Sequence, residues 1–379
     1  MNLLWYVSAK QELKEIATER NVVMDKIKLG LVGVGVYKGS YGRGGGLFTM
    51  AGKNFEQVKL TAACDINPVS LGYIKKNCPE VEAFTDYREM LDKAALDAVI
   101  IGTPAIKHAE FSIAALQRDI SVLSEIPVVY KDEEVGPLLE AERDSEAIFM
   151  TAANPNFAGR LHDLQRVKEL GLLGEPNYME VDYMHDLRYN FQDAPWRAEY
   201  EPIHYCTHSL GPLLTLFEED LEYVTCFDTG GWLESGKPNR HDIMTALFRT
   251  KSNRVVKLTV SFINNFKRKD AHRCIVHGTK GVYGWEDPDK TFFNTTELPG
   301  AHIPVELHSS RFDIRYPQSA SAGHGGMDYV VMDAFLKAVA TGRPSPLSLR
   351  EGLRMSLPGI YAAKSARCGG ELTKIKYPW

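Results

Sequence analysis

Residues 26–151 repeat one pattern, in which a short apolar run is followed by an amphipathic segment with helical spacing. The first run, KIKLGLVGVG at residues 26–35, is continuously apolar and ends in glycines, as a strand buried on both faces does. Similar runs recur in VKLTAACDINP, VEAF, DAVIIGTP, SVLSEIPVV and FMTAANPNF. Parallel strands need long crossover connections, so this alternation predicts a doubly wound parallel sheet of the α/β class.

The glycines after the first strand indicate what this sheet binds. Gly33 and Gly35 are followed by Gly39, one residue later than in the G-x-G-x-x-G pattern that accommodates a dinucleotide pyrophosphate. The second strand ends at Asp65, where a carboxylate can accept hydrogen bonds from the adenosine ribose. The same carboxylate repels the 2′-phosphate of NADP, so the sequence predicts NAD as the cofactor. An alternative role for Asp65 is to cap the helix that begins near Pro68.

Later loops of the first half are predicted to complete the cofactor crevice. Loops that follow the carboxyl ends of parallel strands line the ligand site in sheets of this kind. In this sequence they contain Thr103, Pro104 and Glu125.

The second half of the chain has a different pattern. After GEP at residues 174–176 come longer strands rich in β-branched and aromatic residues, with few helical segments between them. This predicts an open, mostly antiparallel sheet with helices over one face. Because an apolar open face tends to be buried, we expect a homo-oligomer, a dimer or a tetramer.

The chain length and the change of pattern predict a domain organisation. A chain of 379 residues is too long for one ordinary core, so two domains are expected. We expect an N-terminal extension at 1–25, a Rossmann domain at 26–150 and an α+β substrate-binding and oligomerisation domain at 151–379.

Composition excludes several classes of partner. The net charge of −5 and the lack of clustered basic residues give no basis for binding nucleic acid or an anionic membrane. The six cysteines are scattered without a C-x-x-C pair, which is typical of reduced thiols in the cytoplasm. Residues 1–23 have too short an apolar run for a secretory or membrane-spanning segment.

The stretch HYCTHSLGPLL at residues 204–214 contains the most suggestive polar groups. It places His204 and His208 four residues apart, which on a helix puts both imidazoles on one face. A metal site would need a further ligand, and Cys206 would face away from both histidines, so no metal is expected. The two histidines either pack in the fold or exchange protons, for which imidazole is suited near neutral pH.

Motifs along the whole chain from residue 26 resemble the Gfo/Idh/MocA oxidoreductase family. The motifs are GLVGVG, ACDINP, TDYREML, TPAIKHAEFSIAAL, SEIP and HGTKGV, together with the two C-terminal helical segments. The resemblance implies a Rossmann domain, a C-terminal domain with an open sheet, and use of NAD or NADP on sugars or polyols. The family's E-K-P lysine is Ile126 here, and its aspartate four residues before a histidine is His204. An isoleucine cannot carry a proton, so the resemblance does not imply lysine-assisted alcohol oxidation.

Four motifs resemble a narrower branch, glycoside hydrolase family 109, whose members are NAD-dependent α-N-acetylgalactosaminidases. They are SEIP (124–127), HDLR (185–188), YCTHSLGP (205–212) and HGGMD (324–328). A tyrosine of that branch is Phe157 here. This resemblance implies redox-neutral cleavage of a carbohydrate: oxidation at carbon 3, loss of the carbon 2 proton with elimination, addition of water and re-reduction. The principal alternative is a sugar dehydrogenase that releases a keto sugar, and a non-catalytic NAD or sugar sensor is the second.

Three sets of residues are expected to form the site. The expected catalytic residues are His208 and Tyr205. The expected substrate-binding residues, each of which has an alternative structural role, are His185, Asp186, Arg188, Trp196, Arg197 and His324. The expected cofactor-binding residues are Gly33, Gly35, Val36, Asp65, Thr103, Pro104, His108, Glu125 and Asn154.

Overall fold

The computed structural model describes residues 26–235, 237, 239–266, 271–287, 290–295, 302–303 and 323–379. The extension expected at residues 1–25 lies outside the described residues.

The first half forms a six-stranded parallel sheet in the order β5-β4-β1-β6-β7-β8, which confirms the predicted doubly wound arrangement. Its strands are β1 (Ile27–Val32), β4 (Val58–Cys64), β5 (Glu82–Phe84), β6 (Ala98–Ile101), β7 (Ser121–Ser124) and β8 (Phe149–Thr151). Its helices are α2 (Arg43–Asn54), α3 (Pro68–Asn77), α4 (Tyr87–Lys93), α5 (His108–Leu116) and α6 (Val135–Arg143). All four residues of β6 are fully buried, as expected for a strand covered on both faces. Strand order reverses between β1 and β6, which places the ligand crevice at their carboxyl ends.

The second half forms a mixed, mostly antiparallel sheet in the order β16-β15-β14-β13-β9-β12-β11-β10-β17. Its strands are β9 (Pro176–Met184), β10 (Leu221–Asp228), β11 (Met244–Thr250), β12 (Val255–Ser261), β13 (His272–Gly278), β14 (Gly281–Asp287), β15 (Lys290–Thr295), β16 (His302–Ile303) and β17 (Thr373–Lys374). The central pair β9 and β12 is parallel. The run HRCIVHGTKGVYGW forms a hairpin of β13 and β14, and Gly278 and Gly281 at its centre let the chain approach the Leu173 and Leu172 carbonyls closely.

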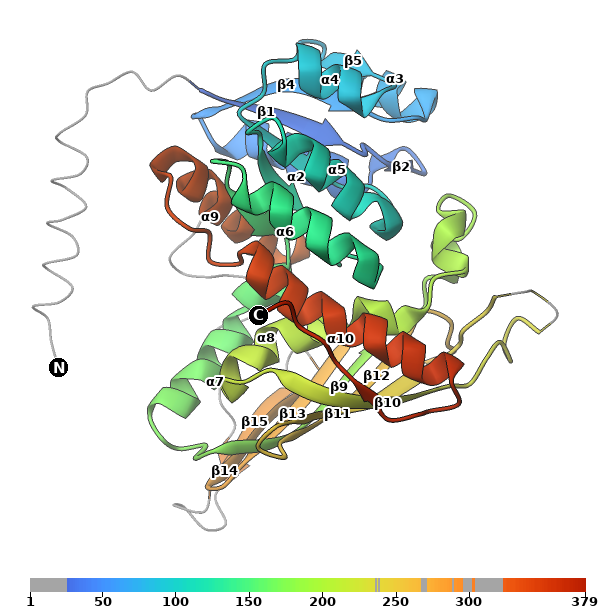
Figure 1. Cartoon of the computed structure of the whole chain (residues 1–379), viewed down its shortest axis with the longest axis vertical. Helices are drawn as coiled ribbons and strands as arrows, with labels where there is room; N and C mark the ends of the chain where they lie inside the picture. Colours follow the sequence, from blue (N-terminus) through green and yellow to red (C-terminus); the bar gives the residue numbers. More distant parts are fainter. Residues whose placement is uncertain are drawn as a thin grey trace, which may run out of the picture.

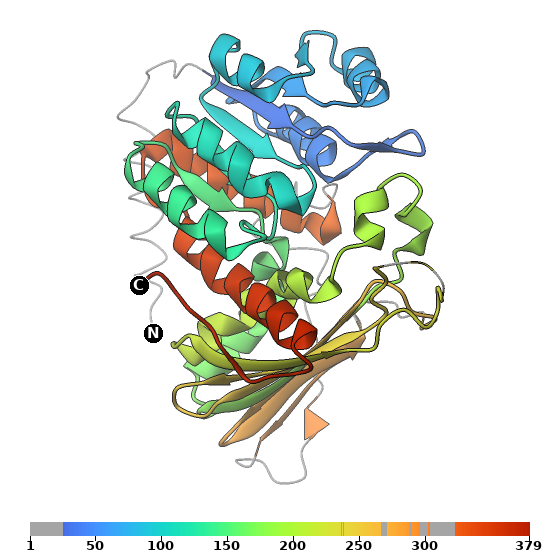
Figure 2. The same ribbon diagram turned by 45° about the vertical axis from the view of Figure 1, so that its right-hand side comes forward.

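The second half of the chain contributes four helices. They are α7 (Gly159–Glu169), α8 (Thr207–Phe217), α9 (Met327–Thr341) and α10 (Leu349–Arg367). Figures 1 and 2 show α8 and α10 between the Rossmann sheet above and the second sheet below. Short 3-10 turns also occur at η1 (Ala105–Lys107), η2 (Asp132–Glu134), η3 (Asn154–Phe157), η4 (Arg188–Asn190), η5 (Pro195–Ala198), η6 (Pro202–Cys206) and η8 (His324–Gly326).

The C-terminal segment returns to the first half of the molecule. Helix α9 packs beside α2, where the rings of Phe55 and Tyr329 stack with centroids 4.7 Å apart. The Thr151 amide donates to the Leu347 carbonyl at 2.8 Å, which ties β8 to the segment before α10. Residues late in the sequence therefore pack against the Rossmann half of the molecule.

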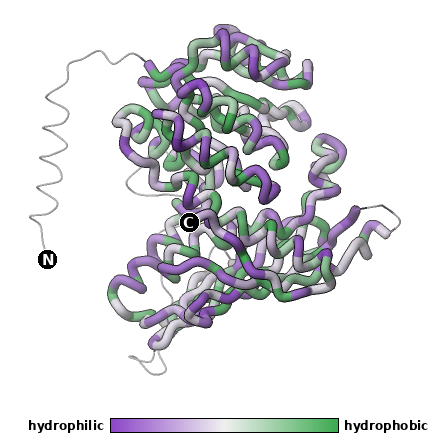
Figure 3. Tube along the Cα trace, in the orientation of Figure 1, coloured by the Kyte–Doolittle hydropathy of each residue, from purple (hydrophilic) through white to green (hydrophobic). Residues whose placement is uncertain are grey.

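The second sheet turns its outer face away from α8 and α10, and that face is less apolar than the sequence pattern suggested. Lys257 and Arg273 form ion pairs with Glu180 there, at 3.0 and 3.3 Å. Farther along the sheet, Phe227 and Leu247 are exposed. Figure 3 shows hydrophilic and hydrophobic residues alternating along the strands and helices, as surfaces with one covered face require. The homo-oligomer expected from this face stays a prediction.

Candidate active site

The glycine-rich loop between β1 and α2 lets two backbone segments approach closely. Gly33 has φ of +89°, and a Cβ there would lie 2.8 Å from the Gly102 carbonyl. A Cβ on Gly44 would lie 2.2 Å from the Gly33 carbonyl oxygen. Gly44, in the first turn of α2, therefore supplies the close contact between helix and strand that the fingerprint requires of its third glycine.

Gly39, expected to be that third glycine, has another role. It lies in a small hairpin of β2 (Val36–Tyr37) and β3 (Ser40–Tyr41), and a Cβ on it would meet nothing within 4 Å. The hairpin lengthens the loop and delays the helix, which sequence spacing alone did not reveal. Val36 is half-buried in this hairpin.

Asp65 lies where the sequence placed it, at the carboxyl end of β4. Its Oδ2 accepts a hydrogen bond from the Gly35 amide at 3.0 Å, and its Oδ1 accepts one from the Asn67 amide at 2.8 Å. The cap of helix α3 is the Asn67 side chain, which accepts from the Val69 amide. Asp65 thus fixes the glycine loop instead of capping the helix, and ribose recognition stays a prediction.

His108 joins the two loops that follow β6 and β7. Its Nδ1 and Nε2 each lie 2.8 Å from a carbonyl oxygen, those of Pro127 and Thr103. Burial lowers its pKa below the usual histidine value. The loops that hold Thr103 and Pro104 are therefore held by His108 against the SEIP segment. Direct contact of His108 with the cofactor stays a prediction.

Arg43 forms a charged cluster that the sequence analysis missed. Its Nε contacts Glu125 at 2.7 Å and its Nη1 contacts Asp328 at 2.5 Å. Asp328 also contacts the predicted residues His324, at 2.9 Å, and Asn154, whose Nδ2 donates at 3.2 Å. Burial opposes ionisation of Asp328, but Arg43 and His324 hold its pKa well below the usual range. This cluster, the Arg43 cluster, joins α2, the SEIP segment, η3 and α9.

Sequence signals for the Arg43 cluster existed in two places. Arg43 lies in the glycine-rich stretch and Asp328 closes HGGMD, but nothing local pairs residues so far apart. The cluster also places His324, an expected substrate-binding residue, beside the cofactor crevice.

The two histidines of the 204–214 stretch do not share a site. His204 lies in η6 and His208 in α8, and the change from 3-10 to α-helical geometry between them turns the side chains apart. His204 is buried, stacks on Tyr130 at 4.3 Å and lies 3.4 Å from Glu201. The prediction of one shared helix face is therefore wrong, because each residue of a 3-10 turn rotates the chain by a larger angle than a residue of an α-helix does.

His208 and Tyr205 form a hydrogen-bonded pair. Tyr205 Oη lies 3.0 Å from His208 Nε2, while His208 Nδ1 is buried and has no hydrogen-bond partner among the described residues. Burial lowers the pKa of His208 well below its usual value, and His272, His324 and Arg43 lower it further. His208 is therefore a neutral imidazole with one nitrogen available to a ligand.

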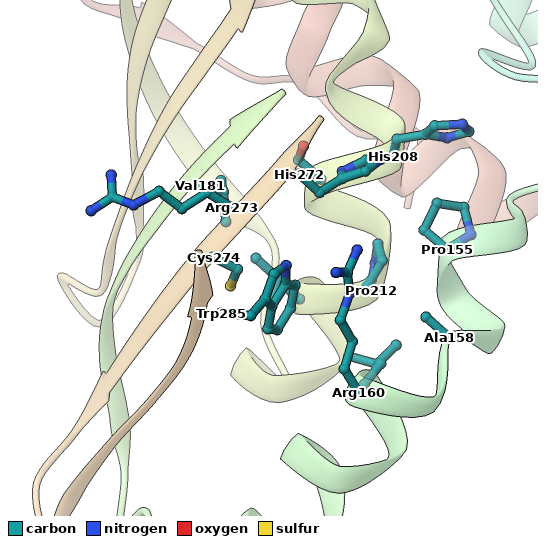
Figure 4. Close-up of a pocket in the computed structure, with 13 residues that line it drawn as sticks. Pro155, Ala158, Arg160, Val181, His208, Pro212, His272, Arg273, Cys274 and Trp285 are labelled. Atoms are coloured by element: carbon teal, nitrogen blue, oxygen red, sulfur yellow. The ribbon is translucent and has the colours of Figure 1, made fainter. Parts of the chain in front are cut away.

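Two residues that the sequence analysis did not assign complete the surroundings of this pair. Tyr183, on β9, lies with its ring centroid 5.0 Å from that of Tyr205. His272, on β13, lies 5.9 Å from His208 between centroids. Figure 4 shows His272 and His208 close together among the side chains that line a small pocket, with Trp285 and Arg160 farther from them. The alternation of buried and exposed side chains along β9 and β13 could have indicated which of their residues point inward. It does not show which strand faces α8, so it could not have assigned Tyr183 and His272 to the site.

Some of the residues predicted to bind substrate lie at the Tyr205–His208 pair, and others contact each other instead. His185 joins the site, because its Nδ1 lies 3.0 Å from Tyr183 Oη. Asp186 and Arg188 instead pair with each other at 2.8 Å. Arg197 stacks on Trp196 with its guanidinium carbon 4.6 Å from the ring centroid.

Arg197 and Phe157 also bear on the expected site. The positive charge of Arg197 lowers the pKa of Tyr205, although the larger effect of burial raises it. Phe157 lies in η3, partly buried against the core. Ile126, at the lysine position of the wider family, is buried and apolar.

Two further features of the described residues bear on the predictions. They contain no group of three or more His, Cys, Asp or Glu side chains arranged to hold a metal ion. None of the described helices combines the length and apolar composition needed to cross a bilayer.

The crevice at the end of β1 fits the predicted dinucleotide. Helix α2 starts at this crevice without an acidic residue in its first turn or a side-chain cap, so its amides can bind phosphate. Thr103 Oγ1 and Arg43 Nη2 are buried there without hydrogen-bond partners among the described residues. A bound NAD would be held by this helix end, the glycine loop and Asp65.

Comparison with known proteins agrees with this geometry. Residues 27–153 match the family model described as "Oxidoreductase family, NAD-binding Rossmann fold", and residues 168–373 match "Oxidoreductase family, C-terminal alpha/beta domain". The chain is 21% identical to an alpha-N-acetylgalactosaminidase of Shewanella oneidensis, over 90% of this chain and 83% of that one.

Solved structures share the fold. One is myo-inositol 2-dehydrogenase from Lactobacillus plantarum, with a TM-score of 0.74, 17% identity, and 93% of this chain and 100% of that chain covered. Another is scyllo-inositol dehydrogenase from Lactobacillus casei with NAD(H) and scyllo-inositol, with a TM-score of 0.72, 18% identity, and coverage of 92% and 99%. Both halves of the chain are thus accounted for by one kind of enzyme, and NAD is its cofactor. The chain belongs to the Gfo/Idh/MocA oxidoreductase family.

Proposed function

We propose that this protein cleaves a glycoside of a small carbohydrate without net oxidation. The observation that carries the proposal is the Tyr205–His208 pair, held 3.0 Å apart with one imidazole nitrogen open, next to a SEIP segment that has no lysine. Curated relatives named glycosyl hydrolase family 109 proteins and alpha-N-acetylgalactosaminidase support the same reaction class.

NAD, when bound, would supply the redox chemistry, namely the removal of a hydride from sugar carbon 3 and its return after cleavage. His208 and Tyr205 are the proposed bases, in either order, for the two protons that the sugar must lose, one from the carbon 3 hydroxyl and one from carbon 2. Tyr205 can act as a base only after its phenol has lost its own proton, which the charge of Arg197 favours. The carbon 3 ketone makes the carbon 2 proton acidic, and departure of the glycosidic oxygen follows. Water then adds at carbon 1, and the pair returns protons to the sugar.

The residues around the Tyr205–His208 pair favour neutral side chains that can exchange a proton over side chains with a permanent charge. Ile126 leaves the SEIP segment apolar, and burial keeps His208 neutral, so it begins as a base. The charge of Arg197 favours ionised Tyr205, and we assign this arginine to substrate binding.

A sugar dehydrogenase is the second candidate. It is favoured by the fold shared with inositol dehydrogenases, and the same pair would then remove only the hydroxyl proton. Its product would be a keto sugar and a stoichiometric amount of NADH.

The test uses a panel of nitrophenyl glycosides, with and without added NAD. We expect NAD-dependent release of nitrophenol, no accumulation of NADH, and deuterium at carbon 2 of the sugar released in deuterium oxide. Stoichiometric NADH with a keto-sugar product would select the dehydrogenase. An absence of any sugar-dependent reaction across N-acetylated and plain hexosides would reject both.

Two wider parts of the proposal concern assembly and location. We propose a homo-oligomer formed through the outer face of the second sheet, which light scattering at high concentration tests. A cytoplasmic location is consistent with the six cysteines, which are all free and five of them buried.

A further inference from the structure

The β2–β3 hairpin, which interrupts the glycine-rich loop, places a tyrosine side chain over the base of that loop. The Gly42 amide donates to the Gly35 carbonyl at 2.8 Å, and this hydrogen bond closes the base of the hairpin. Tyr37 lies against both residues. A Cβ on Gly42 would lie 2.5 Å from the Tyr37 ring, and a Cβ on Gly35 would lie 3.6 Å from the Tyr37 hydroxyl oxygen. The side chain therefore covers the point where the glycine-rich loop leads into α2.

Helix α3 holds the hairpin in position. Tyr73, on α3, donates its hydroxyl to the Gly39 carbonyl at 2.8 Å. The Tyr73 ring also meets the Tyr41 ring edge to face, with centroids 4.8 Å apart. The tip and one strand of the hairpin are thus fixed by the protein itself, so a ligand that contacts Tyr37 does not have to order this segment.

The side of Gly35 that Tyr37 faces is the side on which a dinucleotide approaches. The second glycine of the fingerprint lacks a side chain so that the backbone can come close to the pyrophosphate. Gly35 is that glycine in this chain, and the Tyr37 hydroxyl lies beside the position that its Cβ would take. Helix α2 begins directly after Gly42, so its first amides lie next to the same tyrosine.

The Tyr37 hydroxyl is a hydrogen-bond donor that the protein does not use. No hydrogen bond joins it to another of the described residues, and the side chain is half-buried. Burial raises the pKa of Tyr37 against the opposing charge of Arg197, and Asp65 and Asp193 raise it further. The phenol therefore keeps its proton near neutral pH and can donate it to an anionic acceptor.

The second half of the chain limits the access of water to this hydroxyl. Figures 1 and 2 show the hairpin beside the projecting segment that contains η4 and η5. Arg197, in η5, is near enough for its charge to act on Tyr37. A hydrogen bond to a charged oxygen is stronger where solvent screens it less.

We propose that Tyr37 donates a hydrogen bond to the diphosphate of bound NAD, so that the inserted hairpin supplies a cofactor contact that the glycine fingerprint lacks. The phenol O–H donates to a non-bridging phosphate oxygen, and no proton is transferred. The Tyr37 ring covers the base of the glycine-rich loop at the same time. This inference rests on NAD as the cofactor, and it does not depend on which reaction the protein catalyses.

The first test removes only the hydroxyl oxygen. Tyr37→Phe should weaken NADH binding, measured by fluorescence titration, about 10- to 100-fold, as expected for a lost hydrogen bond to a charged group. The matched control is Tyr41→Phe in the same hairpin, because the Tyr41 ring packs on Tyr73 of α3. This control should change the affinity less than about twofold. Equal affinities of wild type and Tyr37→Phe would overturn the proposal.

The second test locates the contact on the cofactor. ADP-ribose contains the diphosphate and adenosine does not, and each is titrated as a competitor of NADH. Tyr37→Phe should weaken ADP-ribose by the same factor as NADH and leave adenosine within about twofold of wild type. An equal loss for adenosine would place the contact on the nucleoside and contradict the assignment to the diphosphate.

The third test separates binding from loop structure. Stopped-flow measurement of NADH release should show faster dissociation in Tyr37→Phe, by the factor that the affinity loses, with an unchanged association rate. This is expected because the hydrogen bond exists only in the complex. Slower association, together with a lower midpoint of urea denaturation, would mean that Tyr37 only shapes the glycine-rich loop. None of these measurements requires turnover of a sugar, so their outcome is separate from that of the proposed function.

Discussion

Around Arg43 the structure pairs full charges, whereas around Tyr205 and His208 it gathers neutral groups that can donate or accept a proton. Arg43 is held by Glu125 and Asp328, and the low pKa of Asp328 keeps that pair ionised across the neutral range. The pair of Tyr205 and His208 carries no formal charge, because burial disfavours ionisation of both. The first region has a fixed protonation state, and the second has one that can change.

The difference has a physical reason. A buried ion pair is costly to disrupt, so it holds loops and helices in register. A buried imidazole is neutral because burial disfavours its charged form. The free-energy cost of adding a proton to it stays small only if the proton is then passed to another group. The two regions meet at His324, which contacts Asp328 and influences the pKa of His208. Four predictions follow from treating one region as support and the other as chemistry.

The largest effect is expected from His208→Ala. Turnover should fall by about two to four orders of magnitude, the usual contribution of a positioned proton-transfer group. NAD binding, measured by fluorescence or calorimetric titration, should be retained, because the glycine loop and Asp65 belong to the Rossmann half and His208 to helix α8 of the second half. His162→Ala on α7 is the matched control. Full activity of His208→Ala would show that the Tyr205–His208 pair does not carry the chemistry.

Disrupting the charged region should reduce stability. Arg43→Met leaves Asp328 and Glu125 without their cation and should lower the free energy of unfolding by about 3 kcal/mol. Arg88→Met, which removes an exposed pair with Glu110 at 3.5 Å, should cost less than about 1 kcal/mol. Urea denaturation of both variants makes the measurement. Similar losses in the two would show that the Arg43 cluster does not support the crevice.

The two regions should respond to acid in different pH windows. Below pH about 6.5 the unfolded chain protonates His208 and the folded protein does not, so stability falls by up to about 1.4 kcal/mol per pH unit for this group. The pKa of Asp328 is lowered, so its contribution is present above pH about 4 and is lost only as the pH falls further.

Two other titratable side chains also affect how stability changes with pH. Burial would raise the pKa of Glu201, but the neighbouring His204 and the hydrogen-bonded Arg367 lower it to about 2, so this carboxylate too affects stability only in strong acid. The hydrogen bond to Asp228 raises the pKa of His241, so protonation of His241 increases the folding stability of the protein as the pH falls. Urea denaturation at pH 7, 6 and 5 should therefore compare wild type with His208→Gln, in which the slope should be smaller. Identical slopes would contradict a neutral His208.

The smallest effect is expected at Asp65. Asp65→Ala should weaken NAD about tenfold and NADP less, because the carboxylate both recognises ribose and holds the Gly35 amide. Titration with each cofactor measures the two affinities, and Asp92→Ala, which removes an exposed carboxylate paired with Arg118, is the control. An equal loss for NAD and NADP would limit Asp65 to fixing the loop.

The sequence determined the fold class and the cofactor of this protein. Alternating apolar runs and helical segments follow from local periodicity, and the buried strands β1 and β6 show why that pattern implies a parallel sheet. The glycines and Asp65 marked the crevice for the same reason, since strand ends and turns are local features. The motif with Tyr205 and His208 was also found, because both residues lie within one turn of each other.

Only the tertiary structure decided which distant residues share a site. Arg43 meets Asp328, and His208 meets His272 and Tyr183, through the packing of α2 on α9 and of α8 on the second sheet. Even the local pattern failed at His204, where a 3-10 turn replaced the expected α-helix. Periodicity specifies which face of an element is buried, but the partner of that face is chosen by long-range packing, which sequence spacing does not encode.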